Sequence, residues 1–252
     1  LALSLGIDNM NSYLRHFGFG RATGIDIVGE LSGLLPSREW KRRRHDQPWF
    51  PGETIITGIG QGFFLTTPLQ LATATAALAN GGRMLQPNIV QAEQASNSSA
   101  LTPHLPRPQE TISIAQQSHW DRVISSMIDV VHGARGTARA IGKDIPFRIA
   151  GKTGTAQVFG LKEEEEYDAE AIAEKLRDHA LFIAFAPADA PTIAVAVIVE
   201  NGGSGGAVAA PIARKILDAF LLDPEDETET EAEAEAEAEG EPEAETETGA
   251  GQ

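Results

Sequence analysis

Two apolar runs near the end of the chain are joined by a very short link, and this arrangement constrains the fold more than any other feature. The runs are HALFIAFAP (179–187) and TIAVAVIVE (192–200), and only ADAP separates them. Parallel strands need a crossover of a dozen or more residues, whereas antiparallel strands can be joined by a tight turn. The two runs therefore predict an antiparallel hairpin and exclude a helical crossover between them.

A third strand is predicted upstream, and helices are predicted around all three. The run FRIAGKTGTAQV (147–158) has the apolar and glycine content of a strand beside a close neighbour, and an acidic excursion with four glutamates at 163–166 separates it from the hairpin. Segments with helical spacing of their apolar residues are 1–17, 66–82, 118–133 and 207–222. The expected fold class is α+β, an antiparallel sheet flanked by helices.

End signals accompany the helix predicted over 66–82. Thr66 or Thr67 is the expected N-cap, Pro68 takes the first helical position, and Gly81 or Gly82 lies past the end. These signals fix both ends of the helix from local chemistry alone.

Two other predicted helices have an apolar stripe that ends at a glycine. In the first helix, which Gly18 and Gly20 are expected to stop, the stripe is Leu1, Leu5, Met10, Tyr13, Leu14 and Phe17. In 118–133, which Gly133 ends, the stripe is Trp120, Val123, Ile124, Met127, Val130 and Val131. The stripe of 118–133 is expected to be buried.

The remaining segments predict loops. Residues 21–62 are rich in glycine, proline and charge and predict loops with short strands such as GIDIVGE (24–30), while 91–110 predicts an exposed loop. The run KRRR (41–44) lies near Trp40 and Trp49. We expect a solvated basic loop there, and contact with an anionic polymer is the less favoured alternative, because four charges are a weak signal.

Charge divides the chain into two parts. The formal net charge is −16, but 14 of the 36 acidic residues and none of the 20 basic residues lie in 223–252. The body keeps 22 acidic and 20 basic residues, a net charge of −2, so no global field favours nucleic acid. We therefore expect one domain at 1–222 and a disordered Glu/Ala/Thr-rich tail at 223–252.

Metal and cofactor chemistry is not expected. The chain has no cysteine, and its histidines show no metal-ligand spacing; they are His16, His45, His104, His119, His132 and His179. We expect His16, His119 and His132 at helix surfaces or ends, and His179 in a structural role at the start of a strand. The glycine-rich GIGQG (58–62) lacks the spacing of a phosphate loop and predicts a tight turn.

The candidate chemistry lies in the strand that contains Lys-Thr-Gly. Lys152 offers a cation for a substrate carboxylate, Thr153 and Thr155 offer hydroxyl donors, and the backbone N–H of Thr155 offers half of an oxyanion hole. Gly151 and Gly154 indicate close approach by a ligand or by another backbone, so a substrate is expected along this edge as an added strand. The alternative from these residues alone is an exposed strand lysine between two glycines.

The longer motifs resemble the class B penicillin-binding proteins over residues 1 to about 222. GIGQGFFLTTPLQLATATAALANGG (58–82), GKTGTAQV (151–158), DHALFIAFAP (178–187) and the final helix come in the order and spacing of that family. Gln61 in GIGQG is more similar to the elongation-type enzymes than to the division-type enzymes, which tend to have an aromatic residue there.

The resemblance implies a serine-type D-Ala–D-Ala transpeptidase that cross-links peptidoglycan stem peptides and is acylated by β-lactams. It implies the periplasmic face of the bacterial inner membrane as location and membrane proteins of the elongation machinery as partners. Residue by residue, Lys152, Thr153 and Gly154 match the family's catalytic triplet, and Lys152, Thr153 and Thr155 match its substrate-binding strand.

The chain departs from the family pattern in one respect. None of its twelve serines is followed by lysine three residues later, and none is followed by Asn or Asp two residues later. The chain also begins at Leu1, within an apolar pattern. We therefore expect a C-terminal fragment, inactive alone, whose nucleophilic serine, paired lysine and membrane anchor are encoded upstream.

The residues also allow two other functions and one other candidate nucleophile. A related carboxypeptidase or β-lactamase is disfavoured by the long block from Gln61 to Gly82. A non-catalytic module that binds peptidoglycan peptides or a protein partner is supported by the missing Ser-x-x-Lys. Ser204 lies in a Gly-x-Ser-x-Gly pattern, but no histidine follows it to act as base, so it is disfavoured as a nucleophile.

Overall fold

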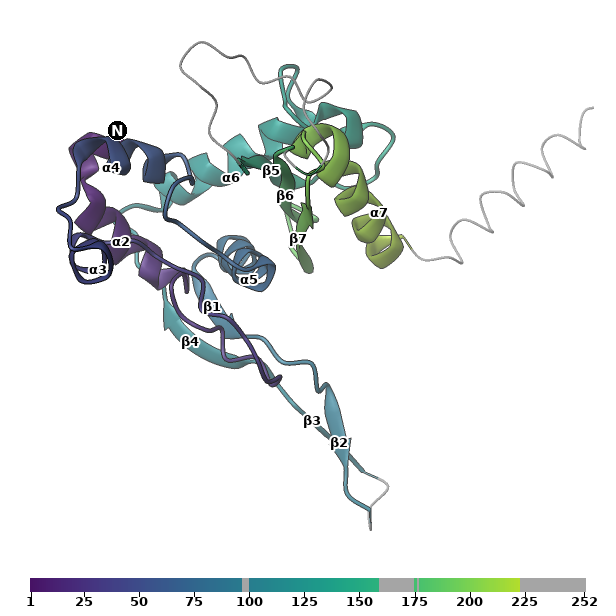
Figure 1. The fold of residues 1–252 in the computed structure, drawn as a ribbon. Coiled ribbons are helices and arrows are strands. Elements are labelled where there is room, and N and C mark those ends of the chain that lie inside the picture. Colours follow the sequence, from purple (N-terminus) through teal and green to yellow (C-terminus); the bar gives the residue numbers. More distant parts are fainter. Residues whose placement is uncertain (97–99, 159–174, 176, 223–252) are drawn as a thin grey trace, which may run out of the picture.

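The computed structural model describes residues 1–96, 100–158, 175 and 177–222 (Figure 1). The acidic excursion at 163–166 and the tail at 223–252 lie outside the described residues. Every strand pairing in the described part is antiparallel, in one three-stranded sheet ordered β5–β6–β7 and two two-stranded ribbons, β1–β4 and β2–β3. The α+β expectation is confirmed.

The central sheet contains the three strands that the sequence predicts. They are β5 (Ala150–Ala156), β6 (His179–Ala186) and β7 (Ile193–Val199). The hairpin between β6 and β7 is closed by a hydrogen bond from Thr192 N–H to the Ala186 carbonyl, 3.0 Å long. Because β6 lies in the middle, β5 is an edge strand with one side free of strand pairing.

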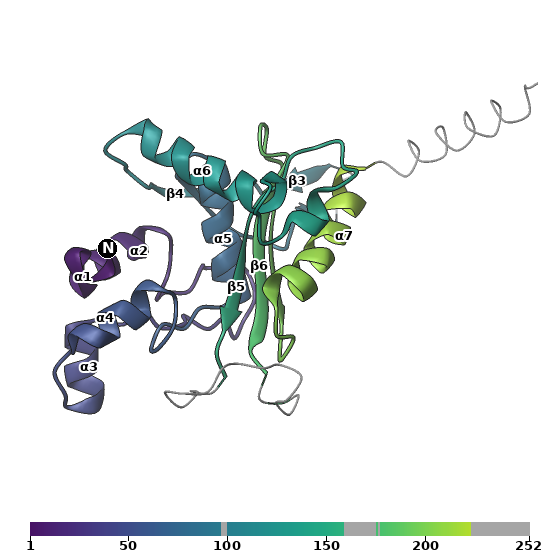
Figure 2. The ribbon, with the colours of Figure 1, turned by 90° about the horizontal axis from the view of Figure 1, so that it is seen from above.

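Helices cover both faces of this sheet (Figure 2). On one face, here called the α7 face, Phe182 and Ala184 of β6 pack with Leu217 of helix α7 (Ala210–Leu221) in a fully buried cluster. On the other, the α5–α6 face, Phe185 packs with Met127 of helix α6 (Gln117–His132) and is approached by Leu78 of helix α5 (Pro68–Ala79). Because side chains alternate between the two faces along β6, this strand contributes residues to both cores.

The end signals of α5 act as the sequence predicts. The Thr67 hydroxyl accepts from Gln70 N–H at 3.1 Å, and the Gln70 side chain accepts from Thr67 N–H at 2.9 Å, which is a capping box. Pro68 occupies the first turn, and Gly81 and Gly82 follow the helix with φ of +64° and +90°. The same Gln70 side chain donates to the carbonyls of Arg21 and Ser32, so the cap also anchors the segment that contains these two residues.

Helix α6 buries most of its predicted stripe but not all of it. Trp120, Met127 and Val131 are buried, whereas Val123 keeps 46% of its surface exposed. Gly133 follows the helix as predicted. The exposed Val123 lies over a hollow that is described below.

The predicted helix over 1–17 is in fact two helices. Helix α1 (Ala2–Leu5) and helix α2 (Ile7–His16) are separated by Gly6, whose φ is +76°. That left-handed region suits glycine and breaks a right-handed helix. The apolar spacing was continuous enough to hide this break.

The prediction of loops and short strands over 21–62 is wrong, because two helices form there and the named strand does not. Helix α3 (Arg38–His45) follows Ser37, whose hydroxyl accepts from Trp40 N–H at 3.1 Å, and helix α4 (Pro51–Gly58) starts with proline in its first turn. Both start signals are present in the sequence. The segment GIDIVGE forms no strand, and the only strand-like pairing among residues 21–62 is the bridge between Leu34 and Leu65.

The basic run is not a solvated loop either. Lys41 is 2% exposed, its ammonium pairs with Glu53 of α4, and it lies 4.4 Å from the centre of the Phe50 ring. Burial raises the pKa of Glu53, but hydrogen bonds from Lys41 and from Phe50 N–H outweigh it and hold the pKa below its ordinary value. Lys41 therefore joins α3 to α4, and the arginines around it remain at the surface.

In the expected exposed loop at 91–110, nearly all described residues are exposed, but the segment contains strands. Strands β2 (Ala92–Gln94) and β3 (Leu101–Pro103) pair with each other, and β4 (Arg107–Thr111) pairs with β1 (Arg83–Gln86). Figure 1 shows these ribbons extending away from the helices. Backbone hydrogen bonds between the strands hold such ribbons together. Because their side chains are exposed, they lack the apolar pattern that identifies buried strands.

Within the residues that the structure describes, no helix combines the length and apolar character needed to cross a lipid bilayer.

Candidate active-site strand and its surroundings

The four residues of the candidate site lie together on β5. In the register with β6, Lys152 is opposite Ile183, Thr153 is opposite Phe182 and Thr155 is opposite Ala180. Because neighbouring residues of a strand point to opposite faces, Lys152 points to the α5–α6 face, and Thr153 and Thr155 point to the α7 face. A ligand along the free edge of β5 would lie between these two sets of side chains.

The two glycines of the motif have reasons in the chain's own packing. A Cβ added at Gly151 would lie 2.5 Å from the ring of Phe182, and one at Gly154 would lie 3.1 Å from Cβ of Leu181. Gly205 packs directly against the backbone of Gly154. The close approach that the glycines indicate is therefore internal, and the expectation of a ligand along this edge rests on the remaining residues.

Lys152 is exposed and folds along its own strand. Its ammonium donates to the carbonyl of Thr153 at 2.6 Å, and no ion pair of Lys152 is formed within the described part of the chain. A single backbone carbonyl is a weak partner for an ammonium group. A carboxylate would be a stronger one, so the group is placed and available to bind an anion.

An apolar hollow of about 350 Å³ opens on the face to which Lys152 points. It is lined in part by Ile183, the cross-strand neighbour of Lys152, and by Tyr13, Phe17, Leu78, Trp120 and Val123. Trp120 is fixed there because its indole N–H donates to the Leu78 carbonyl at 3.0 Å. The hollow thus lies between helices α2, α5 and α6 and the sheet.

Thr153 is held by a second threonine that sequence reasoning missed. Its hydroxyl lies 2.9 Å from the hydroxyl of Thr137, and Gly206 packs against the backbone of Thr137. Thr137 lies in the turn that follows α6, where neither a motif nor periodicity distinguishes it. A ligand that needs the Thr153 hydroxyl would share it with Thr137.

Ser204 has a structural role. It precedes a wide helical turn (Gly205–Ala209) that leads into α7, and its hydroxyl accepts from Ala207 N–H at 3.3 Å. Such an N-cap satisfies a helix end, and among the described residues the printed contact of this hydroxyl is with a backbone N–H and not with a side-chain base. This agrees with the sequence argument against Ser204 as a nucleophile.

Two histidines accept backbone hydrogen bonds at strand ends of the central sheet. His132 Nε2 accepts from Ile149 N–H at 3.0 Å, which ties the last residue of α6 to the start of β5. His179 Nδ1 accepts from Asn201 N–H at 2.9 Å at the start of β6. Burial, with a smaller effect of the Arg148 charge, lowers the pKa of His132, so its neutral, accepting form is favoured.

Gln61, which lies in the predicted glycine turn, reaches the end of β5. Its side-chain Nε2 donates to the Thr155 carbonyl at 2.7 Å, and its Oε1 accepts from Gln157 N–H at 3.3 Å. Gly60 and Gly62 on either side have φ of +76° and +75°. The turn was predicted from these glycines, but nothing in the sequence indicates that its side chain meets a strand more than 90 residues away.

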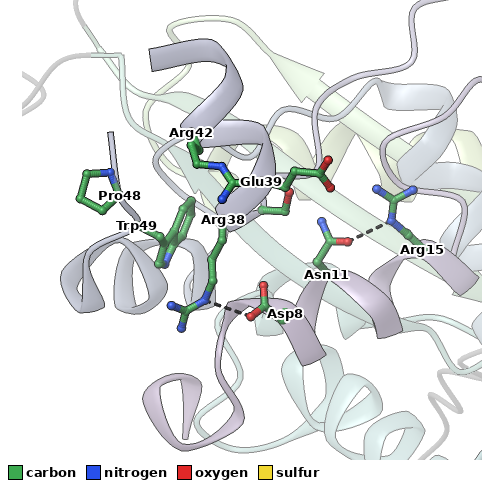
Figure 3. A pocket seen from close by; sticks show the side chains of 9 residues that line it. Asp8, Asn11, Arg15, Arg38, Glu39, Arg42, Pro48 and Trp49 are labelled. Carbon is green, nitrogen blue, oxygen red and sulfur yellow. Dashed lines mark hydrogen bonds and ion pairs between the residues drawn. The ribbon is translucent and has the colours of Figure 1, made fainter. Parts of the chain in front are cut away.

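A second hollow, of about 560 Å³, lies away from this strand, between α2, α3 and the segment before α4 (Figure 3). Its charges are mixed: Arg38 pairs with Asp8 at 2.9 Å, and Arg15 donates to Asn11 at 2.9 Å. Asn11 in turn donates to the Pro36 carbonyl at 2.8 Å. These contacts tie α2 to the start of α3.

No group of three or more acidic or histidine side chains within the described ranges is placed to hold a metal ion.

Comparisons with known proteins place the chain in a family. Residues 1–218 match the family described as the penicillin binding protein transpeptidase domain. The "Peptidoglycan D,D-transpeptidase MrdA" of Haemophilus influenzae is 42% identical over 222 residues, which is 88% of this chain and 34% of that relative. The protein of the same name from Escherichia coli K12 is also 42% identical, over 88% of this chain and 35% of its own length.

Solved structures agree with these relatives. PBP2 of Pseudomonas aeruginosa, in complex with WCK 5153, is 46% identical with a TM-score of 0.75, over 88% of this chain and 46% of that one. PBP2 of Helicobacter pylori in complex with MreC is 29% identical with a TM-score of 0.70, over 88% and 38%. The chain spans about a third of the length of the curated relatives. It belongs to the penicillin-binding protein transpeptidase family and is of the MrdA, or PBP2, type.

Proposed function

We propose that this chain forms the ligand-binding sheet of a peptidoglycan D,D-transpeptidase that cross-links stem peptides during cell-wall elongation. The observation that carries the proposal is the Lys-Thr-Gly triplet on an edge strand, with an exposed Lys152 whose partner among the described residues is a backbone carbonyl. Family membership and the names of the MrdA relatives support the same activity.

The reaction is an acyl transfer in two steps. A serine oxygen attacks the carbonyl carbon of the penultimate D-Ala, an ester forms, and the terminal D-Ala leaves with its nitrogen protonated. The amine of a neighbouring stem peptide then attacks the ester, an amide forms, and the serine regains its proton. A β-lactam replaces the donor in the first step, and the ester that it forms blocks the serine.

In this scheme the residues of β5 bind and orient the donor. Lys152 anchors its terminal carboxylate, and the hydroxyls of Thr153 and Thr155 donate to it. The Thr155 N–H stabilises the oxyanion that develops at the attacked carbonyl. Thr137 keeps the Thr153 hydroxyl in one orientation.

The nucleophile of this scheme lies outside the 252 residues. We assign residues 1–222 to the C-terminal part of the transpeptidase domain, and we assign 223–252 to a tail that adds solubility without catalysis. The protein would act at the periplasmic face of the inner membrane, and the PBP2–MreC complex of H. pylori is a precedent for a partner of that elongation type.

The test compares the isolated chain with the full-length protein that contains it. After incubation with penicillin, intact mass spectrometry should show one added penicillin mass on the full-length protein and none on the isolated 252-residue chain. Ser204→Ala in the full-length protein should leave that adduct unchanged, which controls for acylation at the glycine loop. A stoichiometric adduct on the isolated chain, mapped to Ser204, would overturn the assignment.

A non-catalytic module that binds peptidoglycan peptides is the second candidate. It is favoured by one observation, the absence of Ser-x-x-Lys from all twelve serine positions. The same experiment separates the two candidates, because a binding module would give no adduct in the full-length protein either.

A further inference from the structure

The free edge of β5 is occupied at one end by a side chain of the same protein. The amide of Gln61 donates to the Thr155 carbonyl at 2.7 Å and accepts from Gln157 N–H at 3.3 Å. One side-chain amide therefore supplies a donor and an acceptor to a carbonyl and an N–H that lie two residues apart. A residue of a neighbouring β-strand would offer the same pair of groups.

This contact shows which backbone groups of β5 face the free edge. In an antiparallel pair, alternate residues direct their N–H and C=O groups toward the partner strand and away from it. Since Thr155 and Gln157 are directed away from β6, Gly151 and Thr153 are too. The Thr153 carbonyl agrees with this, because it accepts from the Lys152 ammonium.

Among the described residues, the edge from Gly151 to the N–H of Thr155 pairs with no other strand, and Gln61 occupies the Thr155 carbonyl and the Gln157 N–H after it. At about 3.3 Å per residue, this stretch is about 13 Å long. We propose that Gln61 is a positioning residue that ends the ligand-accepting edge at Thr155 and fixes the direction of the Thr155 N–H. The proposal rests on the proposed function, in which an extended peptide ending in a carboxylate pairs with this edge.

The chain holds Gln61 in place from the other side. Gln61 N–H donates to the Ile56 carbonyl at 3.1 Å, and Gly60 N–H donates to the Thr57 carbonyl at 2.9 Å, so the turn continues directly from α4. A Cβ at Gly62 would lie 2.9 Å from the Ile56 side chain. The backbone hydrogen bonds tie Gln61 to α4, so α4 supports the end of β5 through this residue.

Only some side chains can make this contact. Glutamine has an N–H donor and a carbonyl acceptor on one planar group, whereas leucine has a similar size and neither. Ionised glutamate accepts only and would repel the Thr155 carbonyl, but protonated glutamate again has one donor and one acceptor. The two partners of Gln61 are backbone atoms, so they do not titrate.

This chemistry gives a test with three variants of the full-length protein: Gln61→Leu, Gln61→Glu and, as control, Gln47→Leu. Gln47 is exposed and forms no hydrogen bond within the described ranges. Two quantities are measured for each variant: the rate of hydrogen exchange at the Gln157 amide and the second-order rate constant of acylation by a fluorescent penicillin. Both are measured between pH 4.5 and 7.5 and are expressed as ratios to the parent.

Gln61→Leu should speed exchange at the Gln157 amide about fivefold, the factor that corresponds to one ordinary hydrogen bond, and should lower acylation by a similar factor at every pH. Gln61→Glu should recover part of the parent's exchange protection and acylation rate at pH 4.5, where about two fifths of its carboxyl groups are protonated, and should fall to the leucine level above pH 6, where nearly all are ionised. A structural role alone would not give this recovery at low pH. Gln47→Leu should match the parent throughout.

Two results would overturn the proposal. One is unchanged exchange and acylation, within twofold, in Gln61→Leu. The other is an equal loss in Gln61→Glu at low and neutral pH. If the parent itself is not acylated, the proposed function fails, and exchange at Gln157 still decides whether Gln61 closes this edge.

Discussion

The two faces of the central sheet have different surroundings, although the same three strands form both. On the α7 face, Phe182 and Ala184 are fully buried beneath α7 and the turn before it. On the α5–α6 face, the far end of the sheet is buried, but Ile183 borders an apolar hollow and Lys152 points to the same side. The α7 face therefore carries the larger buried core together with Thr153 and Thr155, whereas the α5–α6 face carries Lys152 beside an open hollow.

The largest effect is expected from Phe182→Ala on the α7 face. Removing a fully buried ring leaves a cavity that costs about 3–5 kcal/mol of the free energy of unfolding. Urea unfolding of the full-length protein, followed by circular dichroism, measures this loss. Val123→Ala on the hollow should cost about 0.5 kcal/mol or less, as at other exposed positions. Equal losses would show that the hollow is filled by another segment, and the contrast between the faces would disappear.

Lys152→Ala should affect the ligand and not the fold. A charge-assisted contact to a carboxylate is worth about 1.5–3 kcal/mol, so acylation by penicillin should slow roughly tenfold or more. A ligand that lacks the carboxylate should lose less, and Lys215→Ala on the exposed side of α7 should have no effect. Similar losses for both ligands would point to a folding defect instead of a lost anchor.

A smaller effect, dependent on pH, is expected where α6 meets the sheet. The pKa of His132 is lower in the folded protein than in the unfolded chain, mainly because of burial and also because of Arg148. The unfolded chain therefore binds more protons just below its pKa of about 6.5, so the stability is complete above that pH and is lost as the pH falls.

His132→Gln tests this assignment, because the amide oxygen can still accept from Ile149 N–H but does not titrate. Urea midpoints of the full-length protein at pH 5 and pH 7.5 should differ less in the variant than in the parent. His119→Gln, elsewhere on the same helix, is the matched control. A pH dependence that survives in His132→Gln would assign it to another group.

The smallest effect is expected from removing the acidic tail. Residues 223–252 contain 14 acidic residues, no basic residue and few apolar ones, so they have little with which to bind the sheet. Deleting them from the full-length protein should leave the acylation rate unchanged within about twofold. A tenfold drop would connect the tail to one of the two faces.

The sequence was most informative where burial imposes a period. The three strands, the α5 cap and the stripe of α6 were predicted because apolar spacing and end signals are local. Helices α3 and α4 were missed although Ser37 and Pro51 mark their starts, because charged residues hide the helical period of α3 and glycines that of α4. Lys41 shows the reason best: its partner Glu53 lies outside the helix, so composition could not show that it is buried.

The sequence names the residues of the candidate site, which stay a prediction, but it does not give their arrangement. Lys152 and its neighbours follow from a short motif, whereas Thr137, His132 and Gln61 contact β5 through bonds between segments far apart in the chain. Such contacts leave no spacing pattern in a single sequence. The opposite faces of Lys152 and Thr153 follow from strand alternation once the register is known.

The order of the strands also has a kinetic consequence. Six residues join β6 to β7, whereas 22 residues separate β5 from β6. Closing the longer connection costs about 1 kcal/mol more conformational entropy, and short-range contacts form first. The strand with Lys152 is therefore expected to join the sheet last during folding and to detach first from it. Its assembly would then depend on α4, through Gln61, and on α6, through His132, which hold the two ends of this strand.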